Sequence, residues 1–454
     1  MQTDPEEGEM AERVHLVSLG CPKNRVDSEV MIGKLRGSDC ELVDTPEEAD
    51  VIVVNTCSFI QPATEESIDT VLQMSGYKET GNCEKLIVTG CMVQRFGAAL
   101  EDELPEVDHF LGTGEYHRID EVLRSSNGAG PKTHVDVPMY IHDEFAPRVN
   151  SWKGHSAWLK ISEGCNHRCA FCIIPTLRGK MRSRTIDSLM VEARNLAAEG
   201  VRELNLVSQD STAYGRDLAD GGDLGALLRS LATIEDIDWI RLHYAYPIGL
   251  PASLLEAIAE EPKVCNYLDM PLQHASGPML KAMRRGVTRA GQERILDRVR
   301  KHVPGIAIRT TFIVGFPGET DEDFSELVDF IRVQKFDRVG VFTYFQEDGT
   351  DAALLPNQVP DDVKEERQRV LMEVQAEISR ARLDSLIGTE VPVLIDGQSE
   401  DHEWVITGRL ETQAPEVDGQ VFLEMPPDDI LPGQIRMVRI DRSSDYDLVG
   451  TVVA

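Results

Sequence analysis

The sequence predicts an α/β protein of three successive parts: a parallel α/β domain, a partial barrel of six strand–helix units, and a small β-barrel. Apolar strands alternate with helical segments from residue 13 to about 125, and the same alternation returns between residues 156 and 342. Five short strands separated by Gly, Pro and Asp turns complete the chain. The expected parts are a disordered acidic lead-in, the first domain, a linker, the central domain and the final domain, at residues 1–12, 13–125, 126–150, 151–386 and 387–454.

The composition is that of an ordinary globular protein. Of the 454 residues, 41% are hydrophobic and 27% are charged, which suits several domains with buried cores. The apolar runs at 51–54 and 86–88 are far too short to span a bilayer, and the acidic N-terminus has no basic or apolar region typical of a signal peptide. Nine cysteines without an export signal favour metal ligation over disulfides. We therefore expect a cytoplasmic protein without membrane contact.

Each of the first three apolar strands ends a few residues before a cysteine. The strands are residues 14–18, 51–54 and 86–88. The cysteines are Cys21, Cys57 and Cys91. Strands alternating with helices indicate a flavodoxin-like parallel sheet, and the carboxyl ends of its strands share one edge. We therefore expect the three thiols to form one metal site, although buried cysteines can also end strands as small hydrophobic residues.

Three further cysteines fall in the stretch ISEGCNHRCAFCIIP at residues 161–175: Cys165, Cys169 and Cys172. Thiolates at this spacing can converge on one metal centre, and soft sulfur selects zinc or iron–sulfur clusters. A closed cluster has four cysteine ligands, so three predict a cubane with one iron open to a small ligand. The alternatives are a zinc loop completed by a distant histidine, and unrelated thiols. The other cysteines, Cys40, Cys83 and Cys265, lack such placement and are expected to be structural.

The six strand–helix units predict an open, partial (βα)6 barrel with its chemistry at the C-terminal ends of the strands. Residues at those ends are candidates for a ligand pocket, although each could be a cap or loop residue: Gln209, Asp210, His243, Gln273, His274, Gly315, Phe316 and Gly318. A basic run, LRGKMRSR, follows the cysteine loop. It could neutralise a bound carboxylate or the charge of a cluster, or form a solvated face, through Arg178, Lys180, Arg182 and Arg184.

The five strands after residue 389 predict a small OB-like barrel. From residue 390 to the end there are fourteen acidic residues and four basic ones, and the whole chain has a net charge of −32. Nucleic-acid binding requires the opposite sign, because Lys and Arg neutralise phosphates. The charge favours a basic protein as partner, and it is also compatible with solubility alone.

The cysteine loop resembles the signature of the radical S-adenosylmethionine (SAM) superfamily, C-xxx-C-x-aromatic-C, with Phe171 in the aromatic position. In that superfamily the open iron binds the amino and carboxylate groups of SAM, and one electron cleaves the sulfonium to a 5′-deoxyadenosyl radical. Over nearly the whole chain the sequence is similar to the methylthiotransferase family, on the motifs SLGCPKN, NTCSFI, TGCMVQR and FIVGFPGET. The resemblance implies two 4Fe–4S clusters, a SAM pocket at Phe171 and the strand-end residues, and a C-terminal TRAM domain.

Within the family, SLGCPKNRVDSE, YLDMPLQHAS and CIIPTLRGKMRSR are similar to the RimO-type branch. That branch methylthiolates the β-carbon of an aspartate in the twelfth protein of the small ribosomal subunit. The implied mechanism places a methyl group from one SAM on sulfur associated with the N-terminal cluster, and cleaves a second SAM at the central cluster. The radical then removes the aspartate Cβ hydrogen, so no catalytic residue beyond the cluster ligands is implied.

The implied partners are a basic ribosomal protein, either free or on the ribosome, and an electron donor; direct nucleic-acid binding is not expected. Two other functions remain open. A tRNA methylthiotransferase acting on a modified adenosine would require a basic groove that the net charge hides. A ribosome-binding protein stabilised by metal but without catalysis would bind zinc, or a cluster that never cleaves SAM.

Overall fold

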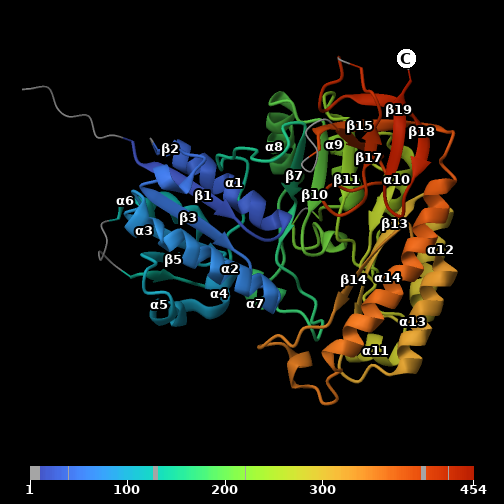
Figure 1. The fold of residues 1–454 in the computed structure, drawn as a ribbon, viewed down its shortest axis with the longest axis horizontal. Coiled ribbons are helices and arrows are strands. Elements are labelled where there is room, and N and C mark those ends of the chain that lie inside the picture. The colour runs from blue at the N-terminus through green and yellow to red at the C-terminus, as the bar shows by residue number, and fades with distance from the viewer. Residues whose placement is uncertain are drawn as a thin grey trace, which may run out of the picture. The chain divides into compact units, whose positions relative to one another are not determined.

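The computed structural model describes residues 11–38, 40–125, 131–219, 221–399, 405–427 and 429–453 (Figure 1). The chain forms two compact units. One comprises the described parts of Met1–Val149 with Ile173–Lys180, and the other comprises Asn150–Cys172 with the described parts of Met181–Ala454. Residues 1–10 of the predicted lead-in and 126–130 of the predicted linker lie outside the described ranges. No helix within those ranges has both the length and the apolar character needed to cross a membrane.

The first unit contains a six-stranded parallel sheet in the order β2-β1-β3-β4-β5-β6, which confirms the flavodoxin-like prediction. Its strands are β1 (Arg13–Ser18), β2 (Glu41–Leu42), β3 (Val51–Thr56), β4 (Lys85–Gly90), β5 (His109–Leu111) and β6 (Thr133–His134). The two central strands, β3 and β4, are buried along their whole length. This explains their continuous apolar sequence, because strands covered on both faces have no solvent side.

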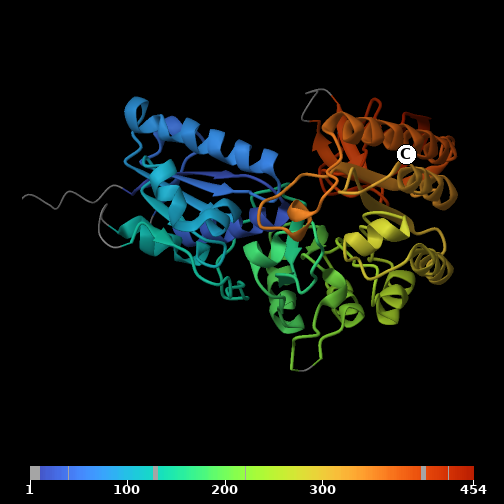
Figure 2. The ribbon, with the colours of Figure 1, turned by 90° about the horizontal axis from the view of Figure 1, so that it is seen from below.

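Helices cover both faces of this sheet (Figure 2). They are α1 (Pro22–Arg36), α2 (Gln61–Ser75), α3 (Tyr77–Thr80), α4 (Cys91–Phe96), α5 (Leu100–Glu103) and α6 (Ile119–Arg124). A further helix of this unit, α7 (Ile174–Arg178), packs against α4. Alternate residues of β3 enter different cores. Ile52 and Val54 pack with residues of α2 and α4, whereas Val51 and Val53 pack with residues of α1 and α6. The side-chain period of two along a strand produces these two layers.

The second unit contains the six predicted parallel strands in chain order. They are β7 (Ser156–Lys160), β10 (Glu203–Val207), β11 (Trp239–Leu242), β12 (Tyr267–Asp269), β13 (Ala307–Val314) and β14 (Arg338–Thr343). They form two three-stranded sheets, β7-β10-β11 and β12-β13-β14, and a parallel bridge between Ile240 and Val264 joins them. The predicted open barrel is therefore confirmed, with a break in regular pairing at its centre.

Helices alternate with these strands. They are α8 (Ile186–Ala198), α9 (Leu224–Ala232), α10 (Ala252–Glu260), α11 (Gly277–Ala282), α12 (Arg289–His302), α13 (Asp321–Gln334) and α14 (Asp361–Asp384). Several begin at side-chain caps that the sequence specifies. Thr185 caps α8, Asp223 caps α9, and Thr320 forms a capping box with Asp323 at α13. These caps fix the loops at the C-terminal ends of the strands, where the cysteine loop lies.

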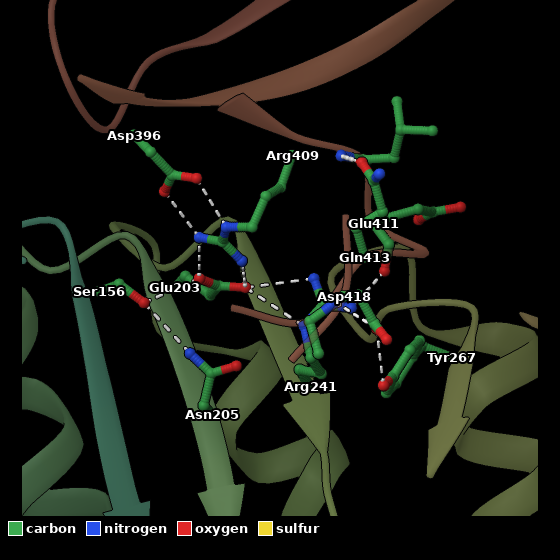
Figure 3. A network of polar contacts seen from close by, with 12 residues as sticks. Ser156, Glu203, Asn205, Arg241, Tyr267, Asp396, Arg409, Glu411, Gln413 and Asp418 are labelled. Carbon is green, nitrogen blue, oxygen red and sulfur yellow. Dashed lines mark hydrogen bonds and ion pairs between the residues drawn. The ribbon is translucent and has the colours of Figure 1, made fainter. Parts of the chain in front are cut away.

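The five strands after residue 389 close into a barrel of order β15-β16-β17-β19-β18, as predicted. They are β15 (Glu390–Gln398), β16 (Ile406–Arg409), β17 (Val421–Leu423), β18 (Ile435–Ser443) and β19 (Leu448–Val452). A buried polar network joins this barrel to the starts of the central strands (Figure 3). Arg409 of β16 binds Glu203, the first residue of β10. The small barrel therefore covers the N-terminal ends of the central strands and leaves the opposite ends to the cysteine loop.

Candidate metal centres

The first candidate centre lies at one edge of the N-terminal sheet. Cys21 precedes α1, Cys57 follows β3, and Cys91 opens α4 directly after β4. Because β1, β3 and β4 are parallel neighbours, their carboxyl ends bring the three cysteines together from positions up to seventy residues apart. The turn that carries Cys21 lies against Cys57, because a Cβ on Gly20 would stand 3.1 Å from Cys57 Sγ.

Two glycines let the cysteine-bearing turns approach closely. Gly20, with φ +87°, precedes Cys21, and a Cβ there would lie 2.8 Å from Cys57 Cβ. Gly90, with φ +101°, precedes Cys91, and a Cβ there would lie 2.5 Å from the carbonyl oxygen of Thr56. Glycine tolerates both the left-handed backbone and the lack of space. Gly20 and Gly90, which precede Cys21 and Cys91, are therefore part of the site's architecture.

Asn24, in the first turn of α1, ties these turns together. Its Nδ2 donates to the carbonyl oxygens of Thr56, at 2.9 Å, and Leu19, at 3.1 Å. In return Asn55 Nδ2 donates to the backbone oxygen of Asn24 at 2.9 Å. The Cys91 thiol points to Asn24 Oδ1 at 3.8 Å. These bonds tie the cysteine-bearing turns to the first turn of α1.

Burial dominates the electrostatics of the thiols. Desolvation raises the pKa of Cys57, and it raises that of Cys91 to about 12 although the nearby Arg178 acts in the opposite direction. A buried thiolate is unfavourable by itself, whereas a metal deprotonates its thiol ligands outright. Three buried thiolates would be stabilised by the positive charge of a bound metal, and a donor set made only of sulfur fits an iron–sulfur cluster or zinc.

Among the described residues, no three His, Cys, Asp or Glu side chains stand close enough to hold a single metal ion. A cubane cluster places its ligand sulfurs farther apart than one ion does, because each sulfur binds a different iron. The spread of the three thiols is thus compatible with a cluster.

The second candidate centre is the loop between β8 (Ser162–Glu163) and α7, which carries Cys165, Cys169 and Cys172. The loop is tightly folded. The Cys172 N–H donates to the carbonyl oxygen of Cys169 at 3.1 Å, and the His167 N–H donates to Cys165 Sγ at 3.4 Å. Burial raises the pKa of the Cys165 thiol to about 11. The donor set is again all sulfur and fits the same kind of group.

Polar residues of two strand ends brace this loop. Gln209 Oε1 accepts from the Gly164 N–H at 2.8 Å, and Gln209 Nε2 donates to Glu163 Oε1 at 2.5 Å. Glu163 also pairs with the fully buried Lys160, at 2.7 Å between Nζ and Oε2. Asp210 Oδ2 lies 2.7 Å from His167 Nε2. The structure thus brings Gln209 and Asp210 to the cysteine loop.

The partners of the other predicted pocket residues lie elsewhere in the barrel. His243 Nε2 lies 3.3 Å from Asn205 Oδ1. Gln273, with φ +73°, pairs with β13 at Phe312, and the Gly315 N–H donates to Glu319 Oε2 at 2.9 Å. The side chains of His274 and Glu319 are both fully buried, with His274 Nε2 lying 3.5 Å from Glu319 Oε2.

Phe171 packs in an apolar cluster instead of standing alone beside the cysteines. Its neighbours are Ala170, Met279, Met283, Phe316 and Tyr344. Phe171 therefore anchors the cysteine loop to α11 and to the apolar residues packed beside that helix.

Sequence reasoning missed an aromatic and cationic group beside the loop. His167 stacks on Tyr246, with ring centroids 3.7 Å apart and planes at 15°. Arg285 lies over the same Tyr246 ring at 4.3 Å, and its Nη1 donates to Cys169 Sγ at 3.3 Å. His167 sits inside the cysteine motif and could have been noticed, whereas nothing in the local sequence distinguishes Arg285.

The basic run after the loop divides between buried and exposed positions. Arg178 and Arg184 are 2% and 4% exposed, so a solvated face is excluded for these two. Arg184 pairs with Glu192 and donates to Ser188 Oγ at 3.0 Å, so it ties the segment before α8 to that helix. Lys180 is exposed.

Comparison with known proteins agrees with this architecture. Residues 159–331 match the radical SAM superfamily, 387–453 match the TRAM domain, and 13–112 match the uncharacterized protein family UPF0004. A ribosomal protein uS12 methylthiotransferase RimO of Anaeromyxobacter sp. (strain Fw109-5) is 51% identical over 443 residues, or 97% of this chain and 93% of that protein. The protein of the same name from Geotalea uraniireducens is 49% identical over 443 residues, 97% and 98% of the two chains.

The chain belongs to the RimO family of ribosomal protein uS12 methylthiotransferases. It is a radical SAM methylthiotransferase, and an iron–sulfur cluster and SAM are its cofactors. The family resemblance stated from the motifs is confirmed.

Two solved structures share the fold at low sequence identity. The radical SAM methyltransferase TsrM of Kitasatospora setae, with cobalamin and a [4Fe-4S] cluster bound, has a TM-score of 0.55 at 15% identity and covers 76% of this chain and 77% of its own. The cobalamin-dependent radical SAM enzyme OxsB gives 0.51 at 15% identity and covers 81% and 56%. These likenesses concern the fold of this RimO-family chain.

Proposed function

We propose that this chain transfers a methylthio group to the β-carbon of an aspartate in ribosomal protein uS12 and that it does so with two 4Fe–4S clusters. Cys165, Cys169 and Cys172 would hold the cluster that binds SAM. Cys21, Cys57 and Cys91 would hold the second. The proposal is carried by one observation: a chain about half identical to uS12 methylthiotransferases presents two separate sets of three cysteines, each at the carboxyl ends of parallel strands.

The cofactors would supply the electron, the radical and the methyl group, and the transferred sulfur would be the sulfur associated with the N-terminal cluster. The chain's own residues would position and shield these cofactors. Gln209 and Asp210 hold the central loop through Gly164 and His167, so that the three sulfurs keep one geometry. Arg285 donates to Cys169, and a cation there offsets the negative charge of thiolates. No general acid or base is needed, because the key step moves a hydrogen atom.

The C-terminal barrel supports a basic protein as substrate. Its four arginines are all engaged with carboxylates. Arg409 is buried against Glu203, and the pairs on the outer surface are Arg436–Asp429, Arg439–Asp441 and Arg442–Glu424. Arginines already held by carboxylates leave little positive charge for phosphates, which nucleic-acid binding requires. An acidic surface instead attracts a partner rich in Lys and Arg. An electron donor is the other partner that the proposal requires.

The substrate assignment predicts which macromolecule gains mass. The reconstituted chain is incubated with reductant and SAM, in one reaction with uS12 and in another with tRNA carrying the modified adenosine. We expect a gain of about 46 Da on one aspartate of uS12, with release of 5′-deoxyadenosine, as the radical cofactor requires. The control is uS12 with that aspartate replaced by asparagine. A gain on the tRNA alone would leave the enzyme class intact and overturn the substrate.

A further inference from the structure

Arg178, the last residue of α7, reaches the N-terminal cysteine site. It follows Cys172 by only six residues in the chain, yet it belongs to the N-terminal unit. Its Nη1 donates to Asp27 Oδ2 at 2.6 Å, and its Nη2 donates to Asn24 Oδ1 and lies 3.5 Å from Cys91 Sγ. The guanidinium therefore touches one of the three proposed cluster ligands and the asparagine that braces all three turns.

Apolar packing fixes this position. Ile173 and Leu177 form a buried cluster with Cys91, and Thr113 Oγ1 donates to the Leu177 carbonyl oxygen at 2.5 Å. Arg178 itself is 2% exposed. In such a poorly solvated environment a charge acts more strongly on its neighbours than it does in water. The helix is docked so that the cation cannot turn away to solvent.

Asp27 and the cysteine site share this cation. The carboxylate of Asp27 is buried, 3% exposed, and neutralises part of the guanidinium charge. Cysteine-ligated clusters carry net negative charge, which increases on reduction, and hydrogen bonds to their sulfurs and nearby charges set the reduction potential. The positive charge of Arg178 and the negative charge of Asp27 therefore have opposite effects on the reduction potential of a cluster at this site.

We propose that Arg178 is a positioning residue of the N-terminal cluster: its hydrogen bond to the Cys91 sulfur stabilises the reduced state and raises the reduction potential. The inference rests on the proposed second cluster. Arg285 has the corresponding place at the other site, with Nη1 3.3 Å from Cys169 Sγ. At each set of three cysteines, an arginine among the described residues is thus directed at a sulfur, which provides a matched control.

The test measures the potential of the N-terminal cluster alone. The background is the full chain with Cys165, Cys169 and Cys172 changed to alanine, reconstituted without oxygen and titrated electrochemically with detection by electron paramagnetic resonance. R178Q should lower the midpoint so that the one-electron equilibrium constant falls about tenfold, which is about 59 mV. D27N should raise it, because the partial neutralisation of Arg178 is lost. R178K keeps the positive charge, so its midpoint potential should lie close to that of the background protein. R285Q should leave the midpoint potential of the N-terminal cluster unchanged.

The opposite shifts in midpoint potential expected for R178Q and D27N distinguish an electrostatic role of Arg178 from a structural one. A residue that only supported the fold would lower iron content in R178Q and D27N alike and would leave the potential of the remaining cluster unchanged. Unchanged midpoints in R178Q and D27N at full iron content would overturn the inference and leave the second cluster standing. A background variant that binds no iron would instead refute the second cluster, and the role of Arg178 with it.

Discussion

Alanine in place of Cys91 is expected to abolish methylthio transfer while the enzyme goes on cleaving SAM. Cys91 is buried in the N-terminal unit, whereas the proposed SAM-binding cluster uses the loop around Cys169 in the other unit. Loss of a supporting group at a metal site costs up to about 100-fold in affinity or activity, and here a proposed ligand itself is lost. Transfer to uS12 should therefore fall at least that far, with 5′-deoxyadenosine release kept within a few-fold of wild type.

The converse variant, Cys169→Ala, should lose both 5′-deoxyadenosine release and transfer, because no radical forms without the SAM-binding cluster. Cys83 and Cys265 are buried cysteines outside both sites and serve as controls. Alanine at either should preserve both reactions. Equal loss of SAM cleavage in Cys91→Ala and Cys169→Ala would contradict separate roles for the two sets of cysteines.

The second large effect concerns the buried network between the C-terminal barrel and the central strands. Arg409 Nη1 and Nη2 bind the two carboxylate oxygens of Glu203 at 3.0 and 2.7 Å, and Arg409 Nε binds Asp396 at 2.7 Å. All three side chains are at most 3% exposed. Arg409→Met should lower the free energy of unfolding by about 3–5 kcal/mol, because removing one partner leaves buried charges uncompensated. Urea denaturation measures the difference.

The same network predicts a pH dependence. Burial opposes ionisation of Glu203, but Arg409 and Arg241 outweigh it and lower its pKa from 4.5 to about 2. Because the pKa of Glu203 is lower in the folded state than in the unfolded chain, its ionised carboxylate stabilises the fold at pH values above 4.5. That stabilisation is lost as the pH falls from 4.5 towards 2. The wild type should lose stability over this range more steeply than Arg409→Met does.

Arg442→Met is the matched control for Arg409→Met. Arg442 also belongs to the C-terminal barrel and pairs with Glu424, but its side chain is 67% exposed. Exposed pairs contribute little to stability, so this variant should unfold like the wild type. Equal effects of the two substitutions would show that Arg409 does not hold the barrel in place.

Much of the fold was predictable because it depends on local patterns. Continuous apolar runs such as 51–54 mark strands covered on both faces, and parallel strands bring residues at their ends to one edge. Cys21, Cys57 and Cys91 could therefore be assigned to one place from sequence alone. The same reasoning placed Gln209 and Asp210 at the end of β10, beside the central loop.

What sequence reasoning missed depends on tertiary contacts. Arg178 and Arg184 occur in one basic run, and no local pattern shows that both are buried or that Arg178 turns to Cys91. Arg285 and Cys169 are 116 positions apart, and Glu203 and Arg409 are 206 apart. The four arginines and Glu203 look like ordinary surface charges in the sequence, because burial of a charge is decided by a partner that the local sequence does not contain.

The most direct test of two clusters is the iron and sulfide content of the chain after reconstitution without oxygen, combined with Mössbauer spectroscopy. We expect about eight irons and about eight sulfides per chain, all in 4Fe–4S clusters. Replacing Cys21, Cys57 and Cys91 together with alanine should reduce the iron to about four, and the remaining cluster should still cleave SAM. A wild-type chain that holds only about four irons, or zinc in place of iron, would contradict the second cluster.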